Sequence, residues 1–188
     1  MPLSQQQKAE IEQIFLEFNE DKTGALSYEE FYYFLRTAWA SESSICSKFA
    51  INLDSNLAHF IFFGAASECT TSVLFSEVFP IIEAIYDENT DFIIRFTFKA
   101  MDPERSNSIP IERIPQAASV FGFSHCQEAI YSKIHSAFGN DKQNLTFQEF
   151  YQLVTNVPSD RAPLLSARKQ PETSQIPQVQ KSACCLLI

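Results

Sequence analysis

Glycine is scarce in this chain, with 4 residues among 188, whereas phenylalanine occurs 18 times. All-β folds depend on glycine in their many turns, so this composition favours packed helices. The 5 cysteines are scattered and show no CxxC spacing, which argues against a disulfide framework or a zinc site. The sequence also lacks a phosphate-binding glycine loop, a dinucleotide motif and a nucleophile elbow. We therefore do not expect an enzyme.

Basic residues are outnumbered by acidic ones, 14 to 23, and long apolar runs are lacking. The formal net charge is −9, and phosphate binding needs a basic footprint, so nucleic acid is not an expected partner. An acidic protein suits metal cations or basic amphipathic helices better. The longest apolar run, residues 60–66, is far too short to span a bilayer. The polar N-terminal residues do not resemble a secretory signal.

Helical periodicity alternates with polar loops four times between residues 5 and 157. From residue 5 to 18 the apolar residues recur at steps of three and four, which predicts an amphipathic helix with Ser4 as its N-cap. A polar loop and a second helical pattern follow, and this unit repeats. Aligned on the aliphatic residue eight places into each loop, the four loops begin at Asn19, Ser67, Asp102 and Phe138.

This arrangement resembles the EF-hand superfamily, in the paired-hand layout of calmodulin-like and calcineurin-B-like proteins. An EF-hand loop supplies oxygen ligands from positions one, three, five, seven, nine and twelve, with glycine at position six. The first loop, residues 19–30, carries most of the resemblance and has Gly24 at position six. The resemblance implies one Ca²⁺ site formed by Asn19, Asp21, Thr23, the carbonyl of Ala25, Ser27 and Glu30.

Asn19 departs from the family, which nearly always has aspartate at position one. An amide oxygen can still bind calcium, but only Asp21 and Glu30 then carry charge among the ligands, and affinity follows ligand charge. We therefore expect weak to moderate binding; the alternative is a retained loop that no longer binds calcium. In this family, the residue at position eight, Leu26, pairs its backbone with the partner loop.

The other three loops depart further, and we expect them to be structural. Position twelve carries Val78 in the second loop and Arg113 in the third, and neither offers a carboxylate. The fourth loop keeps Glu149 there but has Phe138 at position one and Lys142 at position five. Each degenerate hand would bury its apolar face by pairing with a neighbour.

The sequence thus predicts an all-α protein with two lobes of paired EF-hands, residues 1–88 and 89–157, and a flexible tail, 158–188. The boundary is placed at the polar segment 87–91, which can stop one helix and cap the next. A short additional helix is expected near residues 44–51, because the first two loops are spaced more widely than the others. The tail contains proline, glutamine and serine and no aromatic residue, which is typical of a disordered linker.

The last four residues, from Cys185 to Ile188, fit the CaaX prenylation signature. Cys185 is the predicted prenylation site, and the neighbouring Cys184 is a candidate for palmitoylation. Two lipid signals anchor a protein more stably than one, so we expect attachment to the cytoplasmic face of a membrane. The alternative is a chance apolar end on a flexible tail.

Taken together, these features predict a calcium-binding sensor or adaptor that is tethered to a membrane by C-terminal lipidation. In this hypothesis it presents an apolar groove to an amphipathic helix of a target protein. The alternative is a calcium-independent adaptor or regulatory subunit in which all four hands are structural.

Overall fold

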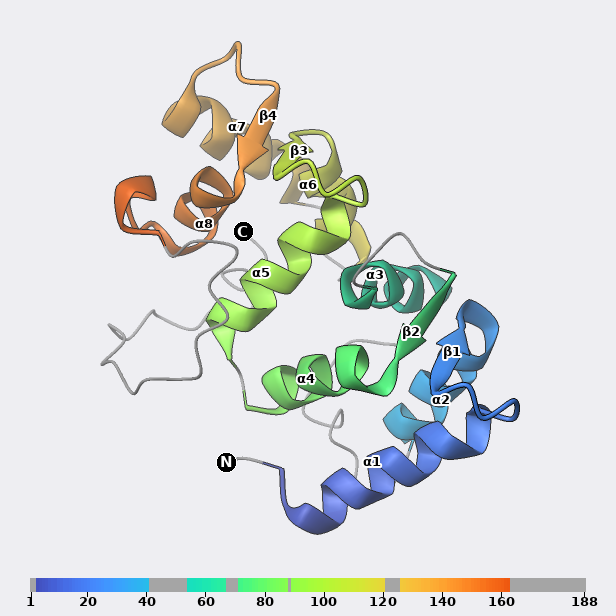
Figure 1. Cartoon of the computed structure of the whole chain (residues 1–188). Helices are drawn as coiled ribbons and strands as arrows, with labels where there is room; N and C mark the ends of the chain where they lie inside the picture. The colour runs from blue at the N-terminus through green and yellow to red at the C-terminus, as the bar shows by residue number, and fades with distance from the viewer. Residues whose placement is uncertain (1–2, 41–53, 67–70, 88, 121–125, 163–188) are drawn as a thin grey trace. The chain divides into compact units, whose positions relative to one another are not determined.

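The computed structural model describes residues 3–40, 54–66, 71–87, 89–120 and 126–162. Across these ranges the protein is mostly helical, with two small antiparallel sheets (Figure 1), which confirms the predicted all-α class in its coarse form. The elements are α1 (Gln5–Phe18), β1 (Ala25–Ser27), α2 (Tyr28–Ala40), α3 (Ser55–Ala65), β2 (Ser72–Leu74), α4 (Phe75–Tyr86), α5 (Thr90–Met101), β3 (Ser108–Pro110), α6 (Arg113–Val120), α7 (Gln127–Phe138), β4 (Asn144–Thr146), α8 (Phe147–Thr155) and the 3-10 helix η2 (Ser159–Arg161).

The chain divides into two compact units, residues 1–104 and 105–188. Helix α5 belongs to the first unit, where it packs against α3 and α4. The predicted lobes, residues 1–88 and 89–157, stay a prediction. The helix expected near residues 44–51 lies outside the described residues.

Two predicted helix caps are present. The Ser4 hydroxyl accepts a hydrogen bond from the Gln7 backbone, and the Gln7 side chain accepts one from the Ser4 backbone, so a capping box begins α1. Helix α4 ends at its C-cap Asp87, and the Asn89 side chain then accepts a hydrogen bond from the Phe92 backbone at 3.1 Å to cap α5. The polar segment between these helices therefore stops one and starts the next, as predicted.

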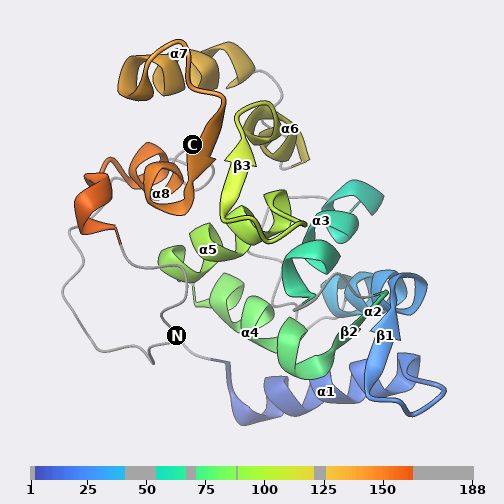
Figure 2. The same cartoon turned by 45° about the horizontal axis from the view of Figure 1, so that its top comes forward.

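Each sheet joins two loops through a fully buried aliphatic pair. In the first unit β1 pairs with β2, and Leu26 lies opposite Val73. In the second unit β3 pairs with β4, and Ile109 lies opposite Leu145. Figure 2 shows β1 and β2 side by side, each leading into the helix that follows it. The predicted backbone pairing of Leu26 is confirmed.

The core of the first unit is largely aromatic. Phe15 of α1 makes edge-to-face contacts with Phe34 of α2 at 5.3 Å and with Phe75 of α4 at 5.1 Å between ring centroids. Phe31 of α2 contacts Phe62 of α3 in the same way at 5.4 Å. Each fully buried phenylalanine contributes about 1.5–3 kcal/mol of hydrophobic stabilisation, so the many phenylalanines hold the helices around the first pair of loops.

The second unit buries an aliphatic and aromatic core between α7 and α8. Ile130 and Ile134 of α7 are fully buried, as is Phe150 of α8 within one per cent. After α8 the chain turns into η2, where the Ser159 backbone donates to the side-chain oxygen of Gln152 at 3.1 Å. No helix in the described ranges has the length and apolar character needed to cross a membrane.

Candidate metal site

The backbone of the first loop, residues 19–30, turns sharply through two left-handed residues. Helix α1 ends where the Asn19 backbone donates to the carbonyl of Phe15 at 3.2 Å. Lys22 and Gly24 then adopt φ angles of +57° and +80°. A β-carbon at Gly24 would meet no atom within 4 Å, so the backbone conformation, not lack of space, favours glycine there.

Three predicted ligand oxygens lie close together in this turn. The Thr23 hydroxyl is 2.9 Å from Oδ1 of Asp21 and 3.1 Å from the carbonyl oxygen of Ala25. The Thr23 backbone also donates to Asp21 Oδ1 at 3.0 Å. Hydrogen bonds from the Thr23 backbone and hydroxyl hold the pKa of Asp21 below its usual value, so this carboxylate is ionised and able to bind a cation at neutral pH.

The last two predicted ligands meet where α2 begins. The backbone N–H and hydroxyl of Ser27 donate to Oε2 of Glu30 at 2.8 and 2.7 Å. Glu30 thereby caps the first turn of α2, where a negative charge is also favoured by the helix dipole. Its other oxygen, Oε1, accepts no hydrogen bond from any residue that the structure describes.

Asn19 supplies the sixth predicted ligand. Asn19 is only 4% exposed, yet its side-chain oxygen Oδ1 has no hydrogen-bond partner among the described residues. Leaving such an oxygen buried and unpaired costs about 1–3 kcal/mol. A bound cation would satisfy it, and a donor set made only of oxygen atoms fits a hard cation such as Ca²⁺.

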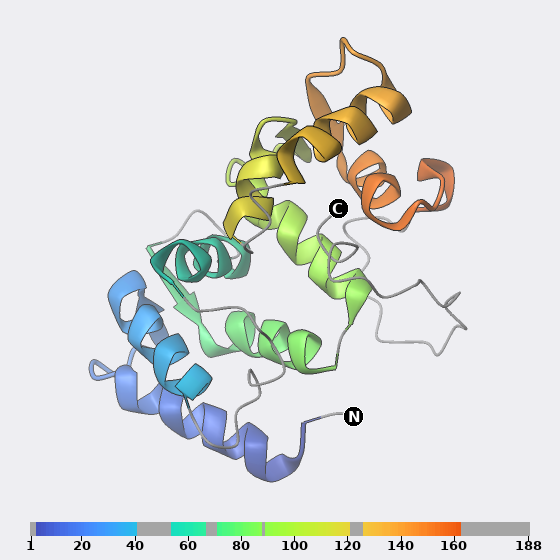
Figure 3. The same cartoon turned by 180° about the vertical axis from the view of Figure 1, so that it is seen from behind.

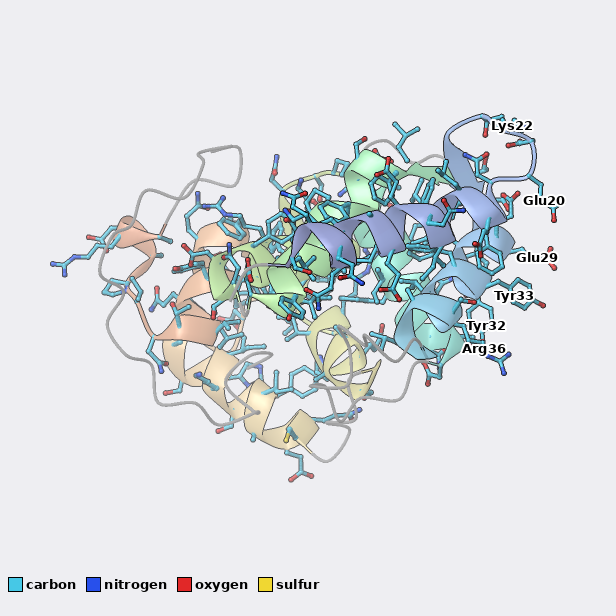
Figure 4. All side chains as sticks on the ribbon, turned by 90° about the horizontal axis from the view of Figure 1, so that it is seen from below. Glu20, Lys22, Glu29, Tyr32, Tyr33 and Arg36 are labelled. Carbon is cyan, nitrogen blue, oxygen red and sulfur yellow. The ribbon has the colours of Figure 1, made fainter. Side chains whose placement is uncertain are left out.

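The candidate metal site in the first loop carries little negative charge. In the described ranges no group of three or more His, Cys, Asp and Glu side chains could hold a metal ion. The first loop combines two carboxylates with neutral oxygens instead. Figure 4 shows the outer side of this loop and of α2, where Glu20 and Lys22 project outward, and both are exposed. The Lys22 ammonium therefore does not fill the loop.

The structure corrects the predicted numbering of the second loop by one residue. Val73, not Leu74, is the buried partner of Leu26, and Leu74 is 45% exposed. The loop therefore comprises residues 66–77, and position twelve carries Glu77 instead of Val78. The Leu74 backbone donates to Glu77 Oε2 at 2.9 Å, as Ser27 does to Glu30. Position one is then an alanine, which offers no side-chain oxygen.

The third loop, residues 102–113, repeats the turn of the first. Arg105 and Asn107, at positions four and six, have φ angles of +55° and +59°, matching the left-handed pair of the first loop. The Ser106 hydroxyl donates to the carbonyl of Ser108 at 2.9 Å, as Thr23 does to Ala25. The difference lies at position twelve, where Arg113 replaces the glutamate.

The fourth loop, residues 138–149, holds a cation of its own. The Lys142 ammonium forms an ion pair with Oε1 of Glu149, at 2.5 Å. The Thr146 backbone and hydroxyl donate to Oε2 of the same carboxylate at 2.9 and 3.0 Å. Partial burial raises the pKa of Glu149, but the contacts with Lys142 and Thr146 outweigh burial, so the net shift is downward.

Within the first loop the structure brings Asp21, Thr23 and Ala25 together and, separately, Ser27 and Glu30, while the side-chain oxygen of Asn19 bonds to none of them. The predicted lipidation sites, Cys184 and Cys185, lie outside the described residues. The sequence analysis missed Glu77 and did not foresee the ion pair between Lys142 and Glu149. An alignment of the loops on a glutamate that is directly followed by an apolar residue would have revealed Glu77. A scan against models of protein families and a search among curated proteins found no match for this chain.

Proposed function

We propose that this chain is a paired EF-hand protein with one Ca²⁺ site, in residues 19–30, that acts as a sensor or adaptor for a partner helix. The observation that carries the proposal is the buried, unpaired Oδ1 of Asn19. It belongs to the same loop as the oxygen cluster of Asp21, Thr23 and Ala25 and the carboxylate of Glu30. A bound cation would give this oxygen the partner that nearly all buried polar groups in folded proteins have.

The paired-hand interpretation is supported by the way the loops recur. Two of them are joined by β1 and β2 and two by β3 and β4, each through one buried aliphatic pair. In three loops the residue at position nine donates its backbone N–H to the glutamate at position twelve. These three loops therefore share one local design at their ends, and their side chains decide which could bind a metal.

Within the first loop each residue would have a defined role. Asn19 ends α1 and Glu30 stands in the first turn of α2, so a cation held by both would connect the two helices. Calcium, when bound, supplies the positive charge that the carboxylates and neutral oxygens surround. Helix α2 in turn contacts α3, because the Tyr28 hydroxyl donates to the carbonyl of Ser55 at 3.1 Å and its ring meets Phe62.

Isothermal titration of the full chain with calcium tests the proposal. Wild type should bind one ion, and Glu30→Gln should lose the heat at concentrations that saturate wild type. Asn19→Asp should bind roughly tenfold more tightly, because it adds a charged ligand. Glu149→Gln, the matched change in the fourth loop, should bind like wild type. Absence of calcium heat from the folded wild type would refute the metal site.

A second candidate is a calcium-independent adaptor, and the ion pair of Lys142 with Glu149 favours it for the second unit. A loop that carries its own ammonium needs no metal to neutralise its glutamate. Binding of a hydrophobic dye to the full chain in calcium and in chelator separates the two candidates. A sensor should bind more dye in calcium as apolar surface is exposed, whereas an adaptor should show no difference.

We propose further that lipidation of Cys185, with Cys184 as an additional palmitoylation site, tethers the protein to the cytoplasmic face of a membrane. This part rests on the sequence motif alone. Intact-mass spectrometry of the protein from eukaryotic cells should show a prenyl group on Cys185 and loss of the three following residues. Cys185→Ser should remove both changes and release the protein from membranes. An unmodified Cys185 in wild type would contradict the proposal.

A further inference from the structure

Helix α2 has a buried face and an exposed one. The buried face contributes three apolar side chains to the core of the first unit, Phe31, Phe34 and Leu35. The other face carries four residues at the spacing i, i+3, i+4 and i+7, namely Glu29, Tyr32, Tyr33 and Arg36. Tyr32 is half-buried and the other three are exposed. Residues at this spacing lie along one side of a helix, so the four form a strip, which we call the outer strip of α2.

Two tyrosine rings form the middle of the outer strip. The rings of Tyr32 and Tyr33 meet edge to face with their centroids 5.7 Å apart, and Tyr33 is 47% exposed. Figure 4 shows both residues on the outer side of α2, and Figure 3 shows α2, in light blue, on the outside of the first unit. Tyrosine and arginine are the side chains most enriched at the energetic centres of protein interfaces. The composition of the strip is therefore that of a contact surface.

Opposite charges stand at the two ends of the outer strip. Glu29 and Arg36 are separated by two helical turns, or about 10 Å along the axis, which is too far for them to pair with each other. Among the described residues neither side chain takes part in a hydrogen bond or an ion pair. The strip is thus neutral as a whole, with one negative end and one positive end.

The order of these residues makes the outer strip complementary to itself. Consider two copies of α2 that lie antiparallel about a twofold axis passing between residues 32 and 33. Glu29 of each copy then meets Arg36 of the other, and Tyr32 of each meets Tyr33 of the other. A parallel pair would instead bring like charges together. Twofold interfaces are self-complementary in this way, and the antiparallel arrangement also opposes the two helix dipoles.

The charge of the first unit favours a second copy at this strip over a basic partner. Residues 1–104 contain 17 acidic and 6 basic residues, so two copies repel each other over most of the unit. The neutral outer strip is where they gain two contacts between opposite charges instead. A basic partner would be attracted to the acidic surface as a whole and would be repelled by Arg36.

We infer that the outer strip of α2 is the contact surface of a homodimer with twofold symmetry. Two helix faces of this length bury less than about 1,200 Å², which is the range of weak and transient complexes. The dissociation constant is therefore on the order of 100 μM. The inference goes beyond the proposed function and does not depend on it, because none of the four residues is a predicted calcium ligand.

Sedimentation equilibrium of the full chain, in chelator and reducing agent, tests the inference. Wild type should change from monomer to dimer as its concentration passes about 100 μM. Arg36→Glu places two carboxylates together at each end of the interface, and it should weaken dimerisation at least tenfold. Tyr33→Ala, which removes a central ring, should weaken it by a similar factor. Lys22→Glu makes the same charge change at an exposed position outside the strip, and it should alter the dissociation constant less than twofold.

Charge reversal tests the antiparallel register directly. Glu29→Arg alone places two guanidinium groups together and should also weaken dimerisation at least tenfold. Glu29→Arg combined with Arg36→Glu in one chain recreates both pairs and should dimerise within threefold of wild type. An equimolar mixture of the two single variants should form heterodimers, because every negative end then meets a positive one. This rescue would also show that the single variants are folded.

Three outcomes would overturn the inference. A wild type that remains monomeric up to about 1 mM would mean that the outer strip does not bind a second copy and is left for another occupant. Dimerisation that survives both single charge reversals would place the contact elsewhere on the chain. Weakened single variants that neither the combined variant nor the mixture rescues would exclude the antiparallel pairing. Because calcium is absent throughout, failure of the metal site cannot produce any of these results.

Discussion

The first and fourth loops share one arrangement at their ends but differ in what lies inside. Glu30 and Glu149 both accept two hydrogen bonds through Oε2 from the residue three places earlier. In the fourth loop Oε1 then receives the Lys142 ammonium. In the first loop position five is Thr23 instead. The comparison teaches that the side chain at position five decides whether the glutamate has a cationic partner within its own loop.

Position one completes the contrast. Asn19 brings a buried oxygen without a partner into the first loop, whereas Phe138 brings none into the fourth. The first loop therefore keeps a buried oxygen without a partner, and a bound metal ion would supply that partner. In the fourth loop the charge of Glu149 is already balanced by the Lys142 ammonium.

The largest expected effect comes from removing the internal cation. Lys142→Met should lower the free energy of unfolding of the second unit by about 1–2 kcal/mol, because Glu149 then loses a charged partner in a partly buried place. Lys22→Met, the control in the first loop, should change it by less than about 0.5 kcal/mol. Urea unfolding measures both. Equal effects of the two changes would break the contrast between the loops.

A smaller effect is expected from replacing the unpaired amide of Asn19 with an apolar side chain. Asn19→Leu should raise the stability of the calcium-free protein by about 1 kcal/mol, since it removes a buried unpaired oxygen. The same change should abolish calcium binding in titration calorimetry. Asn140→Leu, at an exposed position of the fourth loop, should do neither. A loss of calcium-free stability in Asn19→Leu would show that the amide is already satisfied.

The smallest effect is on the pH dependence of stability. The pKa of Glu149 is lower in the folded protein than its ordinary value of 4.5, so the folded state favours the ionised form. The ion pair therefore contributes its full stability above about pH 4.5 and loses it as the pH falls through the folded pKa. The difference in urea stability between wild type and Glu149→Gln should shrink on acidification. A difference that stays constant from pH 7 to pH 3 would mean that the ion pair contributes nothing.

Much of the local structure could be predicted from neighbouring residues. The cap at Ser4, the stop at Asp87 and the start at Asn89 each depend on side chains that bond to backbone groups within a few residues. The turn at Gly24 likewise follows from a residue that tolerates a left-handed conformation. These predictions are confirmed because the energies that decide them are local.

The register of the second loop could not be predicted in this way. Val73 and Leu74 are both apolar, and a shift of one residue moves every side chain of a strand to the opposite face. Which of the two is buried depends on the pairing with Leu26, a residue far away in the chain. The position of Glu77 followed from that pairing.

The sequence by itself determined the helices, the four loops and the set of oxygen-bearing residues in the first loop, because each depends on periodicity or on contacts between near neighbours. Only the tertiary structure decided which residues are enclosed and left without partners. The unpaired oxygen of Asn19 and the ring of Phe96 against Gly64 arise when distant segments pack together. The ion pair of Lys142 with Glu149 arises when the fourth loop folds back on the start of α8. Burial is a property of the folded chain, and burial gives these groups their energetic weight.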